Sequence, residues 1–261
     1  MSTTSKSELV SVEVHDMVAT ITLNRPDKLN AMTPVMADAL QAIVDDINAR
    51  DEVRAVVLTG AGPKAFCAGS DIKDLDHYQT AWQFRNRPDY CDAIRALLKP
   101  TIAAVNGYAL GGGLEMALSC DIRLASETAS FAAPEVKLGW IGGGGMTAQL
   151  ALSIGASNAA MMVMTGDRIS AKQAEQWGLV SALHAPDALL GEALALARTI
   201  ASRAPIAAET ARANLKAAYN MPLEDAIRYE RDLQTICFAT YDAMEGRAAF
   251  AEKREPEFKR R

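Results

Sequence analysis

The sequence predicts an α/β fold followed by a C-terminal region that is almost wholly helical. Over most of the chain, short apolar runs of strand length alternate with segments whose apolar residues recur at helical spacing. From about Leu189 the helical pattern is continuous. A length of 261 residues suits one domain with an appendage. We therefore expect a core over residues 1–200 and a helical region over residues 201–261.

The first predicted elements are a hairpin, a helix and buried strands. Apolar and polar residues alternate over 10–14 and 19–23, and His15-Asp16 lies between the two runs, so this segment predicts a hairpin with one buried face. Residues 33–50 show helical spacing, and Thr33 before Pro34 is a helix start signal. Three short strands are predicted by VRAVVLTG (53–60), TIAAVNG (101–107) and DIRLAS (121–126).

Later segments predict several helices. SAKQAEQWG, residues 170–178, is a short helix in which Ser170 and Gln173 form a capping box and Gly178 ends the helix. The remaining chain predicts helical stretches over 189–205, 206–220 and 223–254. Their apolar residues recur along successive helices and exceed what packing on the core would cover, which predicts an interface between copies of the chain: Ile206, Leu215, Tyr219, Leu223, Ile227, Leu233, Ile236 and Phe238.

Composition excludes several classes of protein. Hydrophobic residues make up 49% and charged residues 23%, as in soluble globular proteins, and the formal net charge of −5 argues against nucleic acid as the main partner. We expect no secretory signal, because the first ten residues have no apolar segment, and no membrane span, because no apolar run is long enough. The four cysteines form no C-x-x-C pair, which indicates reduced thiols in a cytoplasmic protein and neither a metal site nor a disulfide framework: Cys67, Cys91, Cys120 and Cys237.

The segment AVNGYALGGGLEMALSCD, residues 104–121, combines three glycines with a carboxylate. A strand runs into glycines that begin a helix, and the first N–H groups of a helix point outward without internal partners. Gly112 and Glu115 are three residues apart and share a helix face. An oxygen that becomes anionic during a reaction could bind there beside a proton-transferring acid. Tight helix packing is the alternative for the glycines alone.

Two further segments expose backbone or place an acid beside glycines. KAFCAGSDIKDL, residues 64–75, follows a predicted strand and turns at Gly69. In FAAPEVKLGWIGGGG, residues 131–145, Glu135 follows Pro134. An ordinary loop and a solvated or salt-bridged acid remain open for these segments. No Walker A loop or G-x-S-x-G elbow is present, and a dinucleotide fingerprint fits poorly.

Together these segments resemble the enoyl-CoA hydratase/isomerase (crotonase) superfamily, and the resemblance covers nearly the whole chain. Further motifs that carry it are ITLNRPDKLNAM, near the start, and MTGDRISAKQAEQWGLV. The resemblance implies a spiral of ββα units followed by a helical region that builds trimers, often paired into hexamers. It also implies an enzyme of fatty acid metabolism that acts on acyl-CoA thioesters, with no metal and no cofactor other than the CoA of its substrate.

The resemblance assigns roles to particular residues. The backbone N–H groups of Ser70 and Gly112 match the oxyanion hole that binds the thioester oxygen. Glu115 and Glu135 match the two glutamates of the hydratases, which hold a water between them, and which of the two supplies the Cα proton is left open. The adenine-binding loop matches Ala68 to Ile72, with CoA contacts expected from Lys28, Ala68, Ser70, Asp71, Ile72 and Lys73.

The main interpretation is therefore a hydratase that adds water across the double bond of a trans-2-enoyl-CoA. A double-bond isomerase or another crotonase-type reaction is the enzymatic alternative, and a non-catalytic acyl-CoA-binding or scaffold protein is an alternative of another class. The chain departs from the hydratase pattern at Trp140, at Gln149 and in the proline-free run over 141–147. The aromatic, arginine-rich segment over 76–92 shapes the acyl pocket in this family, so these departures bear on the acyl specificity and on the type of reaction.

Overall fold

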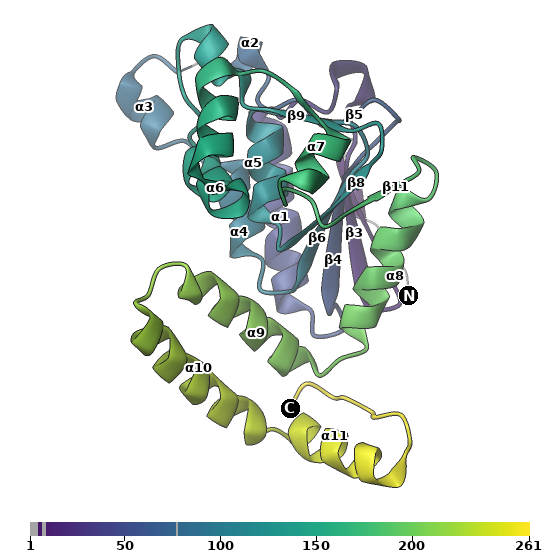
Figure 1. Cartoon of the computed structure of the whole chain (residues 1–261). Coiled ribbons are helices and arrows are strands. Elements are labelled where there is room, and N and C mark those ends of the chain that lie inside the picture. Colours follow the sequence, from purple (N-terminus) through teal and green to yellow (C-terminus); the bar gives the residue numbers. More distant parts are fainter. Residues whose placement is uncertain (1–4, 7–8, 77) are drawn as a thin grey trace.

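The chain folds around two β-sheets, one of seven strands and one of four. The structure is a computed structural model and describes residues 5–6, 9–76 and 78–261 (Figure 1). The strand order is β1-β2-β3-β4-β6-β8-β11 in the larger sheet and β10-β9-β7-β5 in the smaller. The predicted α/β class is confirmed.

The larger sheet begins with the predicted hairpin and continues as parallel strands. Asp16 and Met17, both with positive φ, form the turn between β2 and β3. From β3 onward each neighbouring pair is parallel. The strands are β1 (Ser5–Lys6), β2 (Val10–His15), β3 (Val18–Leu23), β4 (Ala55–Gly60), β6 (Thr101–Val105), β8 (Ile122–Ser126) and β11 (Ala182–His184).

The smaller sheet shows the repeating unit of the fold. Its strands are β5 (Ala65–Cys67), β7 (Tyr108–Leu110), β9 (Ser130–Ala132) and β10 (Ile169–Ser170). Each of β4, β6 and β8 is followed along the chain by a strand of the smaller sheet and then by one or more helices, so the unit is ββα. These helices are α2 (Ile72–Leu75), α3 (Ala81–Arg85) and α4 (Tyr90–Ala96) after β5, α5 (Gly112–Ser119) after β7, and η2 (Pro134–Leu138) with α6 (Met146–Thr165) after β9.

Two predicted helices form with their predicted caps. Helix α1 (Pro34–Ala49) begins where Thr33 Oγ1 accepts a hydrogen bond from Met36 N, and a short 3-10 helix, η1 (Pro26–Lys28), precedes it. Helix α7 (Ala171–Gln176) begins where Ser170 Oγ accepts from Gln173 N, which is the Ser170 half of the predicted capping box. Helix α6 was not predicted from the sequence. Its axis breaks at Gly155, whose backbone dihedral angles are not helical.

Both faces of the central strands β4 and β6 are buried, which explains why these parallel strands read as nearly continuous apolar runs. Helix α8 (Leu189–Ala201) covers one face and packs its alanines against residues of β3, β4, β6 and β8. Helices α1, α4 and α5 and the smaller sheet enclose the main core on the other side. All six residues of β4 are buried.

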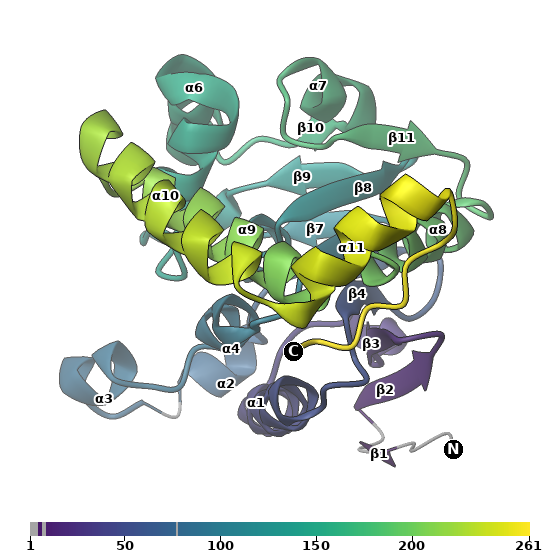
Figure 2. The same cartoon turned by 90° about the horizontal axis from the view of Figure 1, so that it is seen from below.

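The last three helices lie across one end of this core: α9 (Pro205–Ala218), α10 (Leu223–Phe238) and α11 (Tyr241–Glu252) (Figures 1 and 2). The predicted helical stretch over 223–254 is corrected, because Thr240 Oγ1 accepts from Ala243 N and starts a new helix. The division at residue 200 stays a prediction. Across the described ranges, no helix is both long enough and apolar enough to cross a membrane.

Buried ion pairs hold α9 against the core. Lys99 Nζ lies 2.9 Å from Glu209 Oε1, and Arg212 Nε lies 2.6 Å from Asp121 Oδ2. The Lys99 and Arg212 side chains are buried. Arg260, next to the C-terminus, also pairs with Glu209 at 2.9 Å. The helical region is therefore attached to the core through charged contacts, and much of its apolar surface faces outward.

Candidate active site

A pocket of about 890 Å³ lies at the carboxyl ends of the three parallel strands of the smaller sheet. Three segments line the pocket, and each lies at or after the end of one of these strands. They are Ala68–Ser70 after β5, Leu110–Gly112 at the end of β7, and Pro134–Glu135 after β9. The carboxyl ends of parallel strands are the usual ligand-binding edge of such sheets. The fold therefore brings the three candidate segments of the sequence to one cavity.

Two backbone N–H groups are available beside this cavity. Gly112 is the first residue of α5, where an N–H has no partner within the helix. Met32 and Ser70 form an isolated β-bridge, in which Met32 N donates to Gly69 O and Asp71 N donates to Met32 O. Neither hydrogen bond uses the Ser70 N–H. Within the described part of the chain, neither amide donates to a protein acceptor.

The two loops that carry these amides touch each other. A Cβ atom built on Gly69 would lie 3.0 Å from Gly112 N and 3.0 Å from Leu110 O, so only a glycine allows this approach. Gly69 also has a φ of 91°, in the left-handed region. The loop after β5 and the N-terminus of α5 thus form adjoining parts of one wall.

Glu115 lies in the first turn of α5 and is 5% exposed. Its Oε1 accepts hydrogen bonds from Gly144 N at 2.7 Å and Met146 N at 3.1 Å. Burial raises the pKa of Glu115 above its ordinary value; the two backbone bonds oppose this shift, and the charge of Glu135 adds to it. Its carboxylate is thus held at the cavity by a loop that the sequence marks only as four glycines.

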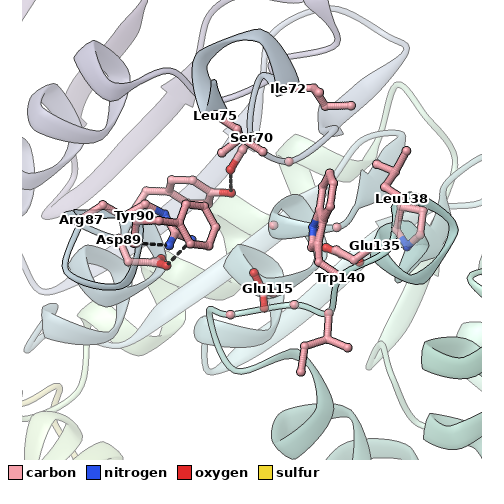
Figure 3. Close-up of a pocket in the computed structure, with 18 of the residues that line it drawn as sticks. Ser70, Ile72, Leu75, Arg87, Asp89, Tyr90, Glu115, Glu135, Leu138 and Trp140 are labelled. Atoms are coloured by element: carbon pink, nitrogen blue, oxygen red, sulfur yellow. Dashed lines mark hydrogen bonds and ion pairs between the residues drawn. The ribbon is translucent and has the colours of Figure 1, made fainter. Parts of the chain in front are cut away.

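Glu135 lies in the first turn of η2 and faces the same cavity from another side (Figure 3). Its Oε1 lies 2.7 Å from where a Cβ atom of Gly111 would be, so the carboxylate sits directly against the glycine turn that begins α5. Its Oε2 is buried and has no hydrogen-bond partner among the residues that the structure describes. Burial raises the pKa of Glu135 above the ordinary carboxyl value.

The residues expected to contact CoA divide into two groups. Ala68, Ser70 and Ile72 line the cavity, and Ile72 is exposed. Asp71 and the two lysines, Lys28 and Lys73, do not line it.

The segments that carry both lysines nevertheless lie side by side. Ala68 N donates to Leu29 O at 3.0 Å, and the Arg25 guanidinium pairs with Asp71 at 2.8 Å. Asp71 also caps α2 by accepting from Lys73 N. Its carboxylate is therefore occupied within the protein, and its backbone N–H donates to Met32 O.

Sequence reasoning missed Tyr90 as an individual site residue. Its hydroxyl lies 2.9 Å from Ser70 Oγ and faces the cavity (Figure 3). Tyr90 is the first residue of α4, and the only local signal is Asp89, whose side chain caps that helix through Cys91 N. The segment over 76–92 was expected to shape the acyl pocket, but which side chain turns inward depends on how α4 packs.

Trp140 and Gln149, which depart from the family pattern, have different surroundings. Trp140 lines the cavity on the side of Glu135 and is 41% exposed (Figure 3). Gln149 is the fourth residue of α6 and lies outside the cavity lining, with its Nε2 3.5 Å from Gly144 O. Trp140 therefore contributes directly to the cavity wall, and Gln149 contacts only the loop that holds Glu115.

Comparison with known proteins identifies the family. The family model described as enoyl-CoA hydratase/isomerase matches residues 13–261. The chain belongs to this family. Among curated relatives, it is 43% identical to the mitochondrial enoyl-CoA hydratase of Pongo abelii over 94% of this chain and 84% of that one. It is 42% identical to a probable enoyl-CoA hydratase of Rhizobium meliloti over 97% and 99% of the two chains.

Solved structures agree with the sequence relatives. The crystal structure of an enoyl-CoA hydratase from Bacillus anthracis matches with a TM-score of 0.90 and 37% identity, over 97% of this chain and all of that one. The predicted superfamily and its crotonase-like ββα spiral with a C-terminal helical region are thereby confirmed.

Proposed function

We propose that this protein is an enoyl-CoA hydratase, a lyase that adds water across the double bond of a trans-2-enoyl-CoA thioester. The observation that carries the proposal is a pair of carboxyl groups, the buried Glu115 and the half-buried Glu135, that face one cavity beside two available backbone N–H groups. The names of the curated relatives support the same reaction.

In the proposed reaction, the thioester oxygen accepts hydrogen bonds from the N–H groups of Ser70 and Gly112. The dipole of α5 adds positive potential at Gly112. As water adds to Cβ, the electrons of the double bond move toward the thioester and negative charge develops on its oxygen. Preorganised donors at that point stabilise the enolate more than the ground state, which accelerates the reaction.

The surroundings of the two glutamates support different roles for them. Glu115 accepts two backbone hydrogen bonds, which favour its ionised form, and we assign it as the base that takes a proton from the attacking water. Glu135 has a buried oxygen without a partner, which favours its protonated form, and we assign it as the acid that delivers a proton to Cα. The two carboxyl groups then exchange protons with water before the next turnover.

This pair also favours hydration over the alternatives. A double-bond isomerase needs one acid/base group to move a proton between Cα and Cγ, so a second carboxyl group facing the cavity has no necessary task there. A non-catalytic binding protein would gain nothing from two carboxyl groups whose pKa is raised by burial. The proposed steps use side chains, backbone amides and water, with CoA as part of the substrate.

The CoA part of the substrate is assigned to the loop after β5. Backbone groups over Ala68–Ile72 would bind the adenine end, and Lys28 and Lys73 would contact phosphates, because both lysines lie on segments joined by the Arg25–Asp71 ion pair. Charge reversal at either lysine, as in Lys73→Glu, should raise KM and leave kcat nearly unchanged.

The apolar surface of the helical region supports a homo-oligomer, either a trimer or a pair of trimers. Helix α10 has no buried residue in the single chain. Large side chains exposed on α9–α11 include Leu215, Tyr219, Leu223, Ile236 and Phe238. Exposed apolar surface of this extent usually marks an interface. Analytical ultracentrifugation at micromolar concentration should show no active monomer, and a stable active monomer would contradict the assignment.

A cytoplasmic location is part of the proposal. Its support is that all four cysteines are free thiols and three of them are buried, as is usual in a reducing compartment.

The function itself is tested with a panel of trans-2-enoyl-CoA and trans-3-enoyl-CoA esters of different acyl chains. Mass spectrometry should detect a gain of one water with at least one trans-2-enoyl-CoA. The 3-enoyl esters separate the alternatives, since an isomerase would convert them to products of unchanged mass. Conversion of 3-enoyl esters without any hydration would overturn the proposed reaction, and binding without conversion of any ester would favour a non-catalytic protein.

A further inference from the structure

Two hydroxyl groups form a pair on the cavity wall that the proposed reaction does not yet use. Tyr90 OH and Ser70 Oγ lie 2.9 Å apart, and both residues line the cavity. Figure 3 shows the Tyr90 hydroxyl reaching toward Ser70 from the side opposite Glu135 and Trp140. Among the described residues, neither hydroxyl has another recorded hydrogen-bond partner.

The Tyr90 hydroxyl lies beside the two residues whose amides bind the thioester oxygen. A Cβ atom built on Gly112 would lie 1.9 Å from Tyr90 OH, so the hydroxyl is in contact with the backbone of Gly112. On its other side it is hydrogen-bonded to the side chain of Ser70. The phenol therefore bridges the residues that supply the two backbone donors.

The pair has one proton more than its shared hydrogen bond requires. When the Ser70 hydroxyl donates to the Tyr90 oxygen, the phenol proton is free to point into the cavity. A hydroxyl that accepts one hydrogen bond becomes a better donor in the next. Burial raises the pKa of Tyr90 well above its ordinary value, so the phenol keeps its proton throughout the neutral range.

We propose that Tyr90 is a third hydrogen-bond donor to the thioester oxygen, in addition to the N–H groups of Ser70 and Gly112. This inference rests on the proposed function, because the charge that it stabilises is that of the enolate. The phenol keeps its proton during the reaction: the water oxygen bonds to Cβ, the electrons move onto the thioester oxygen, and the Tyr90 hydrogen bond shortens as that charge develops. Phenols act as oxyanion donors in other enzymes that form enolates.

The first test compares Tyr90→Phe with Tyr241→Phe. Tyr241 begins α11 outside the cavity lining, and its ring packs against Lys259 and Arg261, so its variant removes the same hydroxyl away from the site. Loss of one oxyanion donor typically lowers kcat by about 10²-fold or more. We expect a loss of about 10²-fold in kcat for Tyr90→Phe with a small change in KM, and no loss for Tyr241→Phe.

The second readout does not depend on turnover. Butyryl-CoA is saturated and cannot be hydrated, so infrared difference spectroscopy can follow its thioester carbonyl stretch when bound. Donors to the oxygen lower this frequency. The downshift should be smaller with Tyr90→Phe than with the wild type or Tyr241→Phe. An unchanged downshift would overturn the proposal even if kcat falls, since the tyrosine would then act only through packing. If the downshift is smaller with Tyr90→Phe but the wild-type protein hydrates no ester, the proposed function is rejected while the Tyr90 hydrogen bond to the thioester oxygen is supported.

Ser70→Ala provides a further check, because it keeps the Ser70 amide and removes only the side-chain hydroxyl. If Ser70 acts through Tyr90, kcat should fall by about 10-fold, and Ser70→Ala combined with Tyr90→Phe should be no slower than Tyr90→Phe alone. Fully additive losses would contradict the hydroxyl pair. Circular dichroism of each variant establishes that the fold is retained.

Discussion

At the scale of single residues, the site depends on two carboxyl groups that are chemically alike and differently surrounded. Glu115 is held by backbone N–H groups, and Glu135 leaves one buried oxygen without a partner. Burial is the largest cause of the raised pKa at both. Because like charges in one pocket disfavour simultaneous ionisation, the two groups are expected to lose their protons in two coupled steps.

This difference predicts a bell-shaped dependence of kcat/KM on pH. As pH falls, the base takes up a proton and activity is lost at a pH above the ordinary carboxyl range, because the pKa is raised. As pH rises, the acid loses its proton and activity falls again. The residual activity of Glu135→Gln should keep the lower limb and lose the upper one. Stopped-flow assays at each pH at which the protein stays folded measure both limbs of the pH profile. An upper limb that persists in Glu135→Gln would contradict the assignment of Glu135 as the acid.

At the scale of elements, the site is built from the turns that follow three strands of one sheet. The loop before α6 is essential to it, because its backbone holds Glu115. A Cβ atom on Gly144 would lie 2.8 Å from Glu115 Oε2 and 2.9 Å from Cys91 Sγ. The neighbouring Gly143 is much less crowded, with its nearest atom, Arg87 Nη2, at 3.8 Å. Glycine is therefore required more strictly at Gly144, where the loop backbone approaches the Glu115 carboxylate closely, than at Gly143.

We predict that Gly144→Ala lowers kcat far more than Gly143→Ala. The added methyl must displace the Glu115 carboxylate, and a shift of about 1 Å in a catalytic group can cost about 10²-fold in rate. Steady-state kinetics of the two variants, with thermal melts to compare folding, measures the difference. Equal rates for the two folded variants would show that the loop does not position Glu115.

The elements also show how far the sequence alone leads. The hairpin, α1, α5 and the strands β4, β6 and β8 follow from apolar spacing, caps and turns, and Glu115 follows from the glycine turn that begins α5. The strands of the smaller sheet and β11 were not predicted. The two N–H groups that hold Glu115 come from residues 29 and 31 positions away, and Ser70 meets Tyr90 over 20 positions. Such contacts depend on tertiary packing, which local periodicity does not encode.

At the scale of the whole molecule, the helical region is attached to the core by buried charges. Arg212 donates to Asp121 and to the carbonyl of Leu97, and Asp121 also accepts from Thr101. Removing one partner of a buried pair leaves an uncompensated charge, which is far more costly than removing an exposed pair. The attachment of α9 should therefore be sensitive to this one residue.

We predict that Arg212→Leu destabilises the protein by about 3 kcal/mol, the scale for breaking a buried ion pair. Arg228→Leu is the matched control, because Arg228 pairs with Asp225 on the exposed surface of α10, and its loss should cost about 0.5 kcal/mol or less. Differential scanning calorimetry at fixed protein concentration compares the two melting temperatures. Equal shifts for both variants would show that the buried pair does not anchor the helical region.

The central claim is that Glu115 and Glu135 act together in hydration, and single glutamine substitutions test it most directly. Glutamine keeps the size of the side chain and removes its acid/base function. Crotonyl-CoA hydration by Glu115→Gln and by Glu135→Gln should each fall by at least about 10²-fold in kcat, while binding of butyryl-CoA persists. Near-wild-type hydration by either folded variant would contradict the account.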